Sequence, residues 1–390
     1  MKPAIRPLGY CTNVHPANTL AQVVGGLDQY AVRVARNLGR PMAVGLWFSQ
    51  EVAQEILLQD DGPQRLAGEL QCRELSCYTL NAFPYGDFHG PRVKQNVYLP
   101  DWSEPPRLAY TQACADILVA LLGADGEGSI STLPLGFKRA HAPDFWDAAA
   151  DHLIQCARHL DHLYHTTGKL LRLAIEPEPL CELETTPEAI SFFQQLWQRA
   201  GRVDAERLVR THLGLCYDVC HQAVEFEDTQ ESIVALDHAG VRINKVQLSC
   251  AVQVDHPGTN AAARAALMPY VEPRYLHQTV ARDAAGALHR AADLTESLIT
   301  AAPEPFASAP IWRIHFHVPI HARCLGLLST TRNELPRALS AIAKLDYRPD
   351  VEIETYTWNI LPDFDGDLVE GLSRELRSAD EMLGAAHQTA

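Results

Sequence analysis

The sequence contains no apolar run long enough to cross a membrane. Its first ten residues, MKPAIRPLGY, also lack the apolar core of a secretory signal peptide. From these two absences we expect a soluble cytoplasmic protein with no inserted membrane segment.

Runs of lysine or arginine are missing as well. The 33 basic side chains are outnumbered by 48 acidic ones, which gives a formal net charge of −15. A protein that follows a phosphate backbone normally gathers positive charge on one face. We therefore expect no nucleic-acid partner. A small carbohydrate-like ligand, either neutral or held through a metal cation, fits this charge better, and the sequence identifies no pathway partner.

Zinc-ribbon cysteine spacing and a glycine-rich phosphate turn are both absent. The ten cysteines are scattered along the chain, a pattern typical of reduced, buried thiols. The first predicted strand ends in Cys11-Thr12-Asn13-Val14-His15-Pro16, without the glycines that follow the first strand of a doubly wound sheet. This argues against an open doubly wound fold.

What the chain does have is a regular alternation of short apolar runs with longer segments of helical period. Such βα repetition predicts parallel strands joined by crossover helices, and the length suits a (β/α)₈ barrel. One predicted helix covers 20–38 and stops at Gly39, and another begins with Thr186 as its N-cap. The strand candidates are 8–14, 43–48, 76–83, 129–134, 171–177, 213–219, 245–249, 312–318 and 351–358.

Nine candidates exceed the eight strands of a barrel. The surplus falls between Lys245 and Val351, a stretch too long for one βα unit. Segments 275–281 and 286–292 predict an inserted hairpin there, within an insertion near residues 270–320, and 312–318 is either a barrel strand or an ordered loop. No break in composition divides the chain, so we expect one domain over residues 1–390.

Acidic side chains stand at the carboxyl ends of several predicted strands, where parallel barrels place their active sites. Alternation in 171–177 puts Glu176 on the face opposite to Leu171, Leu173 and Ile175, so that it points into the barrel mouth. A carboxylate buried there needs a partner or a cation. The alternative is a salt bridge to a basic residue on a neighbouring strand.

Two further strand ends carry candidate ligands. Asp218 and His221 form an Asp-x-x-His pair that can bind a cation or, alternatively, cap a helix. Glu354, on the last predicted strand, is the best-placed partner for Glu176 across the mouth. It could instead be an outer-face acid paired with Lys344 or Arg348.

Histidines and aromatic residues supply the remaining candidates. His315 and His317 share one side of an extended segment, with His321 nearby, an arrangement that suits a transition metal or a hydroxyl-rich ligand. Residues 81–90 mix aromatic, acidic and imidazole groups that could stack on a sugar ring or, alternatively, only pin a surface loop. The residues expected to contact substrate are His15, Asn81, Tyr85, His89, His315 and Trp358.

The sequence resembles the xylose isomerase-like barrel superfamily, through Ile175-Glu176, Asp218-x-x-His221 and Glu354. More narrowly it resembles the EboE "metabolite traffic" proteins of bacterial ebo gene clusters. The stretches that carry this narrower likeness are 9–16, 79–86, 129–135, 275–278, 315–319 and 354–358. The resemblance implies a barrel fold and a role in making or moving a metabolite, but no settled reaction.

In metal-dependent epimerases of the superfamily, two glutamates, an aspartate and a histidine hold one divalent cation (Mn, Zn, Co, Fe or Mg). The resemblance places Glu176, Asp218 and Glu354 in three of these positions. Where the histidine is expected the sequence has Gln247, a poorer neutral ligand. Either His315 or His317 replaces it, or the metal site is weakened or lost.

Three functions follow from these residues. The first is a sugar or polyol isomerase or epimerase in which Glu176 and Glu354 exchange a substrate proton and His221 steadies a hydroxyl. The second is a carrier that kept the barrel and lost catalysis. The third, a phosphodiesterase of the endonuclease IV type, is disfavoured by the charge of −15.

Overall fold

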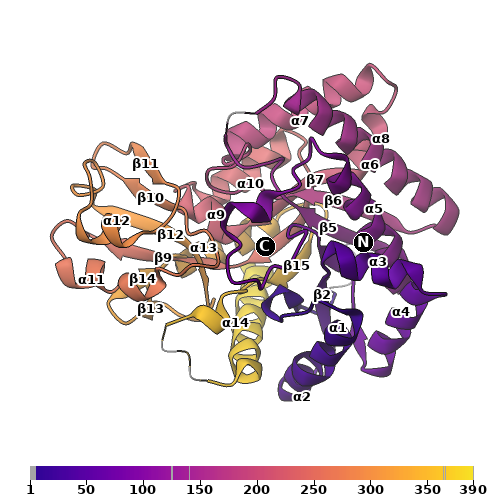
Figure 1. Ribbon diagram of the computed structural model, residues 1–390, viewed down its shortest axis with the longest axis horizontal. Helices are drawn as coiled ribbons and strands as arrows, with labels where there is room; N and C mark the ends of the chain where they lie inside the picture. The colour runs from indigo at the N-terminus through magenta and orange to yellow at the C-terminus, as the bar shows by residue number, and fades with distance from the viewer. Residues whose placement is uncertain (1–5, 124–125, 140, 363, 365, 390) are drawn as a thin grey trace.

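The computed structural model describes residues 6–123, 126–139, 141–362, 364 and 366–389 (Figure 1). Within these ranges eight parallel strands form a closed barrel, in the order β1-β15-β8-β7-β6-β5-β4-β2, and β2 pairs with β1 to complete it. This confirms the predicted (β/α)₈ barrel. The strands are β1 (Gly9–Cys11), β2 (Met42–Trp47), β4 (Thr79–Asn81), β5 (Glu127–Thr132), β6 (Leu170–Ile175), β7 (Leu213–Asp218), β8 (Ile243–Leu248) and β15 (Asp350–Ile353).

The barrel strands are buried on both faces, as in parallel sheets that helices cover from outside. Segment 76–83, predicted as one strand, is broken: β3 (Leu75–Ser76) and β4 pair in turn with the two ends of β2. Among the described residues no helix is long and apolar enough to span a bilayer.

The surrounding helices begin and end largely at the predicted signals. The helix expected over 20–38 is continuous but contains one π turn, and Gly39 ends it in the left-handed conformation with a φ of 64°. The second predicted helix is capped one residue early, since Thr185 rather than Thr186 forms a capping box with Glu188. The helices around the barrel are α1 (Leu20–Gly26), α2 (Val32–Leu38), α3 (Gln50–Leu58), α4 (Gly62–Cys72), α5 (Pro105–Leu121), α6 (Phe145–Thr167), α7 (Thr186–Gly201), α8 (Glu206–His212), α9 (Val219–Val224), α10 (Thr229–His238), α13 (Glu334–Ile342) and α14 (Leu368–Thr389).

Between β8 and α13 the chain builds a second, antiparallel sheet, the orange lobe at the left of Figure 1. The predicted hairpin is present as β10 and β11, but the insertion is larger than residues 270–320. Segment 312–318 is neither a barrel strand nor a loop, because it lies in β12 at the centre of this sheet. The strands are β9 (Cys250–Asp255), β10 (Thr279–Arg282), β11 (Leu288–Ala291), β12 (Ile311–Val318), β13 (Cys324–Leu325) and β14 (Leu328–Thr330), with two short helices α11 (Ala261–Ala265) and α12 (Glu296–Thr300).

The inserted sheet packs against the barrel at the carboxyl ends of the barrel strands. Residues of β9 and β12, such as Val252 and Ile314, belong to the main hydrophobic core with the barrel, and a smaller cluster joins Cys220 and Val224 of α9 to Ala251 and Val280 of the sheet. The register of β12 against β9 shifts between Ile314 and Val318. Such irregularities re-aim side chains. The end of β12 places His315 and His317 within 3.0 and 3.4 Å of His221 at the barrel mouth.

Candidate metal centre at the barrel mouth

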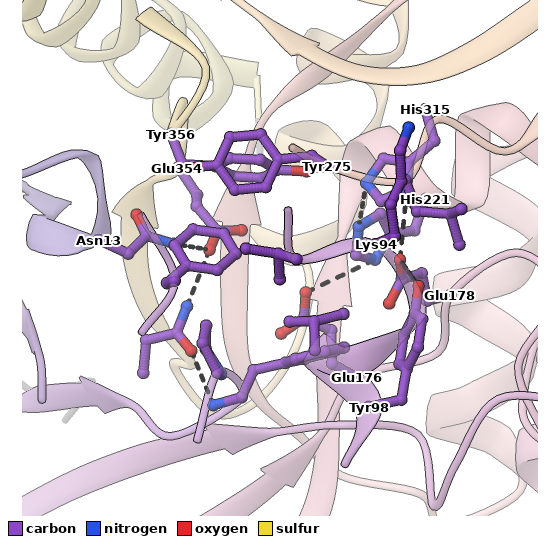
Figure 2. A pocket seen from close by; sticks show the side chains of 17 residues that line it. Asn13, Lys94, Tyr98, Glu176, Glu178, His221, Tyr275, His315, Glu354 and Tyr356 are labelled. Atoms are coloured by element: carbon purple, nitrogen blue, oxygen red, sulfur yellow. Dashed lines mark hydrogen bonds and ion pairs between the residues drawn. The ribbon is translucent and has the colours of Figure 1, made fainter. Parts of the chain in front are cut away.

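Three carboxylates from three barrel strands meet at the mouth. Glu176 follows β6, Asp218 ends β7 and Glu354 follows β15, and one oxygen of each lies within 4.8 Å of the others. All three side chains are buried. Figure 2 shows Glu176 and Glu354 on opposite sides of a narrow space.

Neutral donors hold Glu354 and Asp218 in place. The Oε1 atom of Glu354 accepts hydrogen bonds of 2.8 Å from both Asn13 and Asn81. Asp218 Oδ1 accepts one of 2.7 Å from the Ser249 hydroxyl and one of 2.9 Å from the His221 amide. Asp218 therefore does cap α9, yet its Oδ2 atom has no partner among the described residues.

Glu176 has no matching set of donors. Its Oε1 atom lies 3.5 Å from His221 Nδ1, and its Oε2 atom is buried without a hydrogen bond in the described structure. No lysine or arginine among the described residues pairs with Glu176 or Glu354, so the salt bridges considered as alternatives are not formed. Unsatisfied, clustered carboxylate oxygens are what a divalent cation would use as ligands.

Electrostatics favour neutralisation of this cluster. Burial, followed by the charges of the neighbouring carboxylates, raises the pKa of both Glu176 and Glu354 well above the ordinary value. The nearest buried ammonium, on Lys245, already pairs with Glu352 at 2.6 Å. The cluster therefore carries excess negative charge that only protons or a cation can offset, and its residues fit a divalent metal.

Beside the carboxylates lie three buried histidines. His221 comes from α9, whereas His315 and His317 come from β12. The Nε2 atom of His221 is 3.0 Å from that of His315 and 3.4 Å from that of His317. Burial lowers the pKa of all three, to about 4 for His221. His321, the third histidine of the sequence motif, is half-buried and stacks on Trp358 instead.

The cavity lined by Glu176, Glu354, His221 and His315 is small, with a volume of about 50 Å³. It is covered by what we call the aromatic cap, a cluster of Trp47, Phe88, Val93, Tyr275 and Tyr356. In Figure 2 the rings of Tyr275 and Tyr356 lie close together beside Glu354. Besides the hydroxyls of Tyr275 and Tyr356, the polar groups that line the cavity are Asn13, Asn81, Lys94, Tyr98, Glu176, Glu178, His221, His315 and Glu354.

Several residues expected at the site do not line this cavity. His15 is buried against Tyr10 and stacks on Tyr30. Tyr85 packs against Tyr110 and Arg107.

Three more of the expected residues are also absent from the cavity lining. The ring of His89 hydrogen-bonds to the main-chain carbonyl of Asn13 through Nε2. The indole N–H of Trp358 donates a hydrogen bond to Glu375. Gln247 lies in the barrel interior, where its Oε1 atom faces the Cys216 thiol at 3.4 Å. Of the expected substrate contacts, the structure places only Asn81 and His315 on the cavity wall.

Sequence reasoning missed a fourth carboxylate at the mouth, Glu178. Its Oε1 atom accepts from Tyr98 at 2.7 Å and from Gln278 at 3.0 Å, and it lies 3.3 Å from His315 Nδ1. Burial, the largest effect, raises the pKa of Glu178 to about 7. The run Glu176-Pro177-Glu178-Pro179 held the signal, because prolines on either side fix an extended path beyond the strand.

No protein-family model matches the chain, and no curated protein matches it. Among solved structures it is similar to a xylose isomerase-like TIM barrel protein from Mycobacterium smegmatis in complex with magnesium, with 12% identity over 98% of this chain and 97% of that one and a TM-score of 0.54. It is likewise similar to a D-tagatose 3-epimerase-like protein, with 9% identity over 98% and 99% of the two chains and a TM-score of 0.52. At these identities the likeness establishes a shared fold, the (β/α)₈ barrel.

Proposed function

We propose that this protein is a metal-dependent isomerase or epimerase of a small sugar or polyol. The observation that supports this most strongly is the convergence of Glu176, Asp218 and Glu354 from three barrel strands, with one oxygen of each within 4.8 Å of the others. Two of these acids flank the cavity from opposite sides, which is the arrangement that proton transfer between two faces of a substrate carbon requires.

The residues that would hold the cation are these three acids, with His317 as a fourth ligand. His317 forms a compact group with Asp218 and His221, whereas Gln247 faces Cys216. A divalent cation here would polarise a substrate carbonyl and its neighbouring hydroxyl. Mg, Mn, Zn, Co and Fe all remain candidates, and the similar fold that holds magnesium is compatible with this list.

Side chains of the protein would carry out the proton transfer and position the reacting groups. One glutamate removes the proton on the carbon beside the carbonyl, and the other returns a proton, on the opposite face for an epimerase. Asn13 and Asn81 fix the Glu354 carboxylate through two hydrogen bonds, which limits it to one orientation. His221, kept neutral by burial, is placed to contact a substrate hydroxyl.

A substrate must displace the aromatic cap to enter. The cavity of about 50 Å³ is far below the roughly 300 Å³ at which ligand pockets begin. We therefore infer that the structure represents a closed state, in which water is excluded from the acids, and that opening precedes binding.

The first test compares metal content in the wild type and in a Glu176→Gln/Glu354→Gln double variant, purified without chelator. We expect about one equivalent of a divalent metal to be lost on substitution, because both ligand oxygens lose their charge. Turnover of candidate sugars should vanish in Glu354→Gln alone while the fold persists. Glu206→Gln, on the surface of α8, is the matched control. Unchanged metal content and near-normal turnover in the variants would overturn the assignment.

The closed cavity also favours a second candidate, a non-catalytic carrier for a small metabolite. A ligand that co-purifies tightly and is never converted would support the carrier over the enzyme. In either case we propose a place among the EboE "metabolite traffic" proteins, on the strength of the sequence stretches listed above, with a role in making or moving a metabolite.

A further inference from the structure

A larger cavity lies at the other end of the barrel, away from the candidate metal centre. Its lining includes residues at the amino ends of barrel strands, among them Glu127, the first residue of β5, and Asp350, the first of β15. Helices α13 and α14 supply further walls. The volume is about 700 Å³, which is typical of pockets that bind small organic molecules, whereas the cavity at the mouth has only about 50 Å³.

The charge of this cavity, which we call the amino-end pocket, is opposite in sign to that of the whole chain. Five arginines and three carboxylates line it, although the chain carries a formal net charge of −15. Arg6 and Arg40 pair with two of those acids, Asp350 and Asp380. For the other three arginines the lining offers one further acid, Glu127. The pocket therefore has an excess of positive charge, which favours an anionic ligand.

The three remaining arginines keep unused hydrogen-bond donors. Arg172, on β6, donates to Glu127 at 2.9 Å through Nη1. Arg242, just before β8, forms no ion pair among the described residues, and its guanidinium stacks on the Tyr347 ring, 3.9 Å from the ring centre. Burial and then the charge of Arg172 lower the pKa of Arg242, so the two cations destabilise each other. A bound anion would offset this repulsion and accept from the unused N–H groups.

Buried polar atoms without partners border the same pocket. They are the Nε atoms of Arg172 and Arg242 and the Oδ1 atom of Asn244, none of which has a hydrogen bond within the described ranges. Asn244 is only 4% exposed, and its Nδ2 atom donates to the Leu173 carbonyl at 2.8 Å. Gly214 on β7 permits this contact, because a Cβ there would lie 2.5 Å from Asn244 Nδ2. Unsatisfied buried groups are rare in folded proteins, and they mark places where water, an ion or a ligand completes the network.

The helices give the amino-end pocket an apolar wall. Leu339 and Ile342 come from α13 and Leu383 from α14, and the ring of Tyr78 also lines the space. Apolar side chains of this kind add affinity for a hydrocarbon or ring body, whereas guanidinium groups recognise carboxylates and phosphates. A pocket that combines the two is suited to an acid group carried on an apolar body.

We propose that the amino-end pocket binds a small organic anion, in which a carboxylate or phosphate group is joined to an apolar or ring body. Arg172, Arg242 and Arg348 are its charge partners. This goes beyond the proposed function and does not depend on it, because no residue that lines the cavity at the mouth lines the amino-end pocket. The barrel then has a ligand site at each end.

The test is calorimetric titration of the full-length protein with phenyl phosphate, with benzoate and with inorganic phosphate. We expect one saturable site for a ring-bearing probe, and the tighter of the two identifies the acid group. Inorganic phosphate should bind roughly tenfold more weakly or worse, because it buries no apolar surface. Hydrogen exchange should slow at residues 242–244 and 347–350 in the complex and stay unchanged at 93–94 and 271–276.

Three variants locate the site. Arg172→Gln/Arg242→Gln should weaken binding by at least about tenfold, since each arginine contributes a charge-assisted hydrogen bond. Arg207→Gln, on the exposed side of α8, is the matched control and should bind as the wild type does. Glu176→Gln/Glu354→Gln should also bind normally, so that this result and the fate of the candidate metal centre are separate.

Two results would overturn the proposal. One is the absence of saturable binding of either ring-bearing probe in the millimolar range. The other is binding that survives in the arginine double variant or disappears in the glutamate variant, because the probe then lies elsewhere. If the arginine double variant does not fold, Arg242→Lys takes its place, since it keeps the charge but loses the planar fork and the stacking on Tyr347. Undiminished binding in Arg242→Lys would equally refute the assignment.

Discussion

Lys245 places an ammonium group in the interior of the barrel, below the carboxylates of the mouth. It pairs with Glu352 at 2.6 Å and also donates to Ser131 and to the Leu80 carbonyl. Burial, the largest single effect, lowers the pKa of Lys245. The negative charge of Glu352 and smaller contributions from other groups together outweigh burial and keep the pKa above its ordinary value. Gly45 leaves the necessary room, because a Cβ there would lie 1.6 Å from Glu352 Oε2. The charge of Lys245 also lowers the pKa of Glu176 and Glu354, against the larger effect of burial.

Lys245→Met should destabilise the protein by about 3–5 kcal/mol, since it leaves Glu352 buried and unpaired. The double variant Lys245→Met/Glu352→Gln should lose clearly less, because the uncompensated charge is gone. Chemical unfolding of the wild type, both single variants and the double variant gives the coupling energy. Additive losses in the double variant would contradict the pairing.

At the scale of elements, the segment that carries η3 (Lys94–Tyr98) binds the inserted sheet and closes the mouth. Lys94 Nζ lies 2.6 Å from Asp293 and donates to the Glu272 carbonyl, while the amides of Val93 and Lys94 both donate to the Arg274 carbonyl. Val93 belongs to the aromatic cap. These bonds are what must break when the cap opens.

Lys94→Met should therefore make opening easier by about 1.5 kcal/mol, the scale of one charge-assisted hydrogen bond, or roughly tenfold. Hydrogen exchange should quicken at residues 93–94 and 271–276, and a chelator should strip any bound cation faster. Arg33→Met is the control, since it removes an ion pair with Asp367 in which both side chains are more than half exposed. If hydrogen exchange at residues 93–94 and 271–276 is equally slow in the wild type and in both variants, Lys94 does not hold the cap closed.

The elements also show how far a sequence can be interpreted. Each of the eight barrel strands overlaps a predicted segment, because buried strands leave short runs rich in apolar residues between helical stretches. Segment 312–318 has the same pattern but pairs with β9 and β10. Nothing local distinguishes the two cases, since the choice of partner depends on where the inserted sheet docks.

The same limit applies to the site. Glu176, Asp218 and Glu354 could be placed at one mouth because parallel strand ends must meet there. The approach of His315 and His317 to His221 could not be foreseen, since it depends on the docking of β12 against α9. Trp358 shares its alternation with Glu354, but β15 ends at Ile353 and the tryptophan turns toward α14.

At the scale of the whole molecule, helix α14 ties the barrel to the insertion. Glu375, buried in this helix, accepts hydrogen bonds from Thr355 and Trp358 after β15 and from the Ile320 amide after β12. Burial, the largest effect, raises the pKa of Glu375 to about 7. Because its unfolded pKa is roughly 4.3, folding favours the protonated acid, and the stability that proton contributes is lost as the pH rises from about 4 to about 7.

Glu375→Gln should remove this dependence. Near pH 5 the variant and the wild type should unfold at similar temperatures, since the amide resembles the protonated acid. Near pH 8 the variant should be relatively more stable, because the wild type then buries a charge. Glu370→Gln, on the exposed face of α14, should show no such difference between the two pH values. If the unfolding temperature of Glu375→Gln falls further below that of the wild type as the pH rises, the raised pKa of Glu375 is contradicted.

The polar groups at the mouth are spread along nearly the whole chain, from Asn13 to Glu354. During synthesis on the ribosome these groups emerge one after another, and Glu354 is the last of the lining acids to leave the exit tunnel. A nascent or truncated chain can therefore present isolated acids and imidazoles but never the assembled cluster. Any cation that the complete cluster holds with high affinity would therefore mark a molecule whose barrel has closed, and its dissociation would be an early sign that barrel and insertion have come apart.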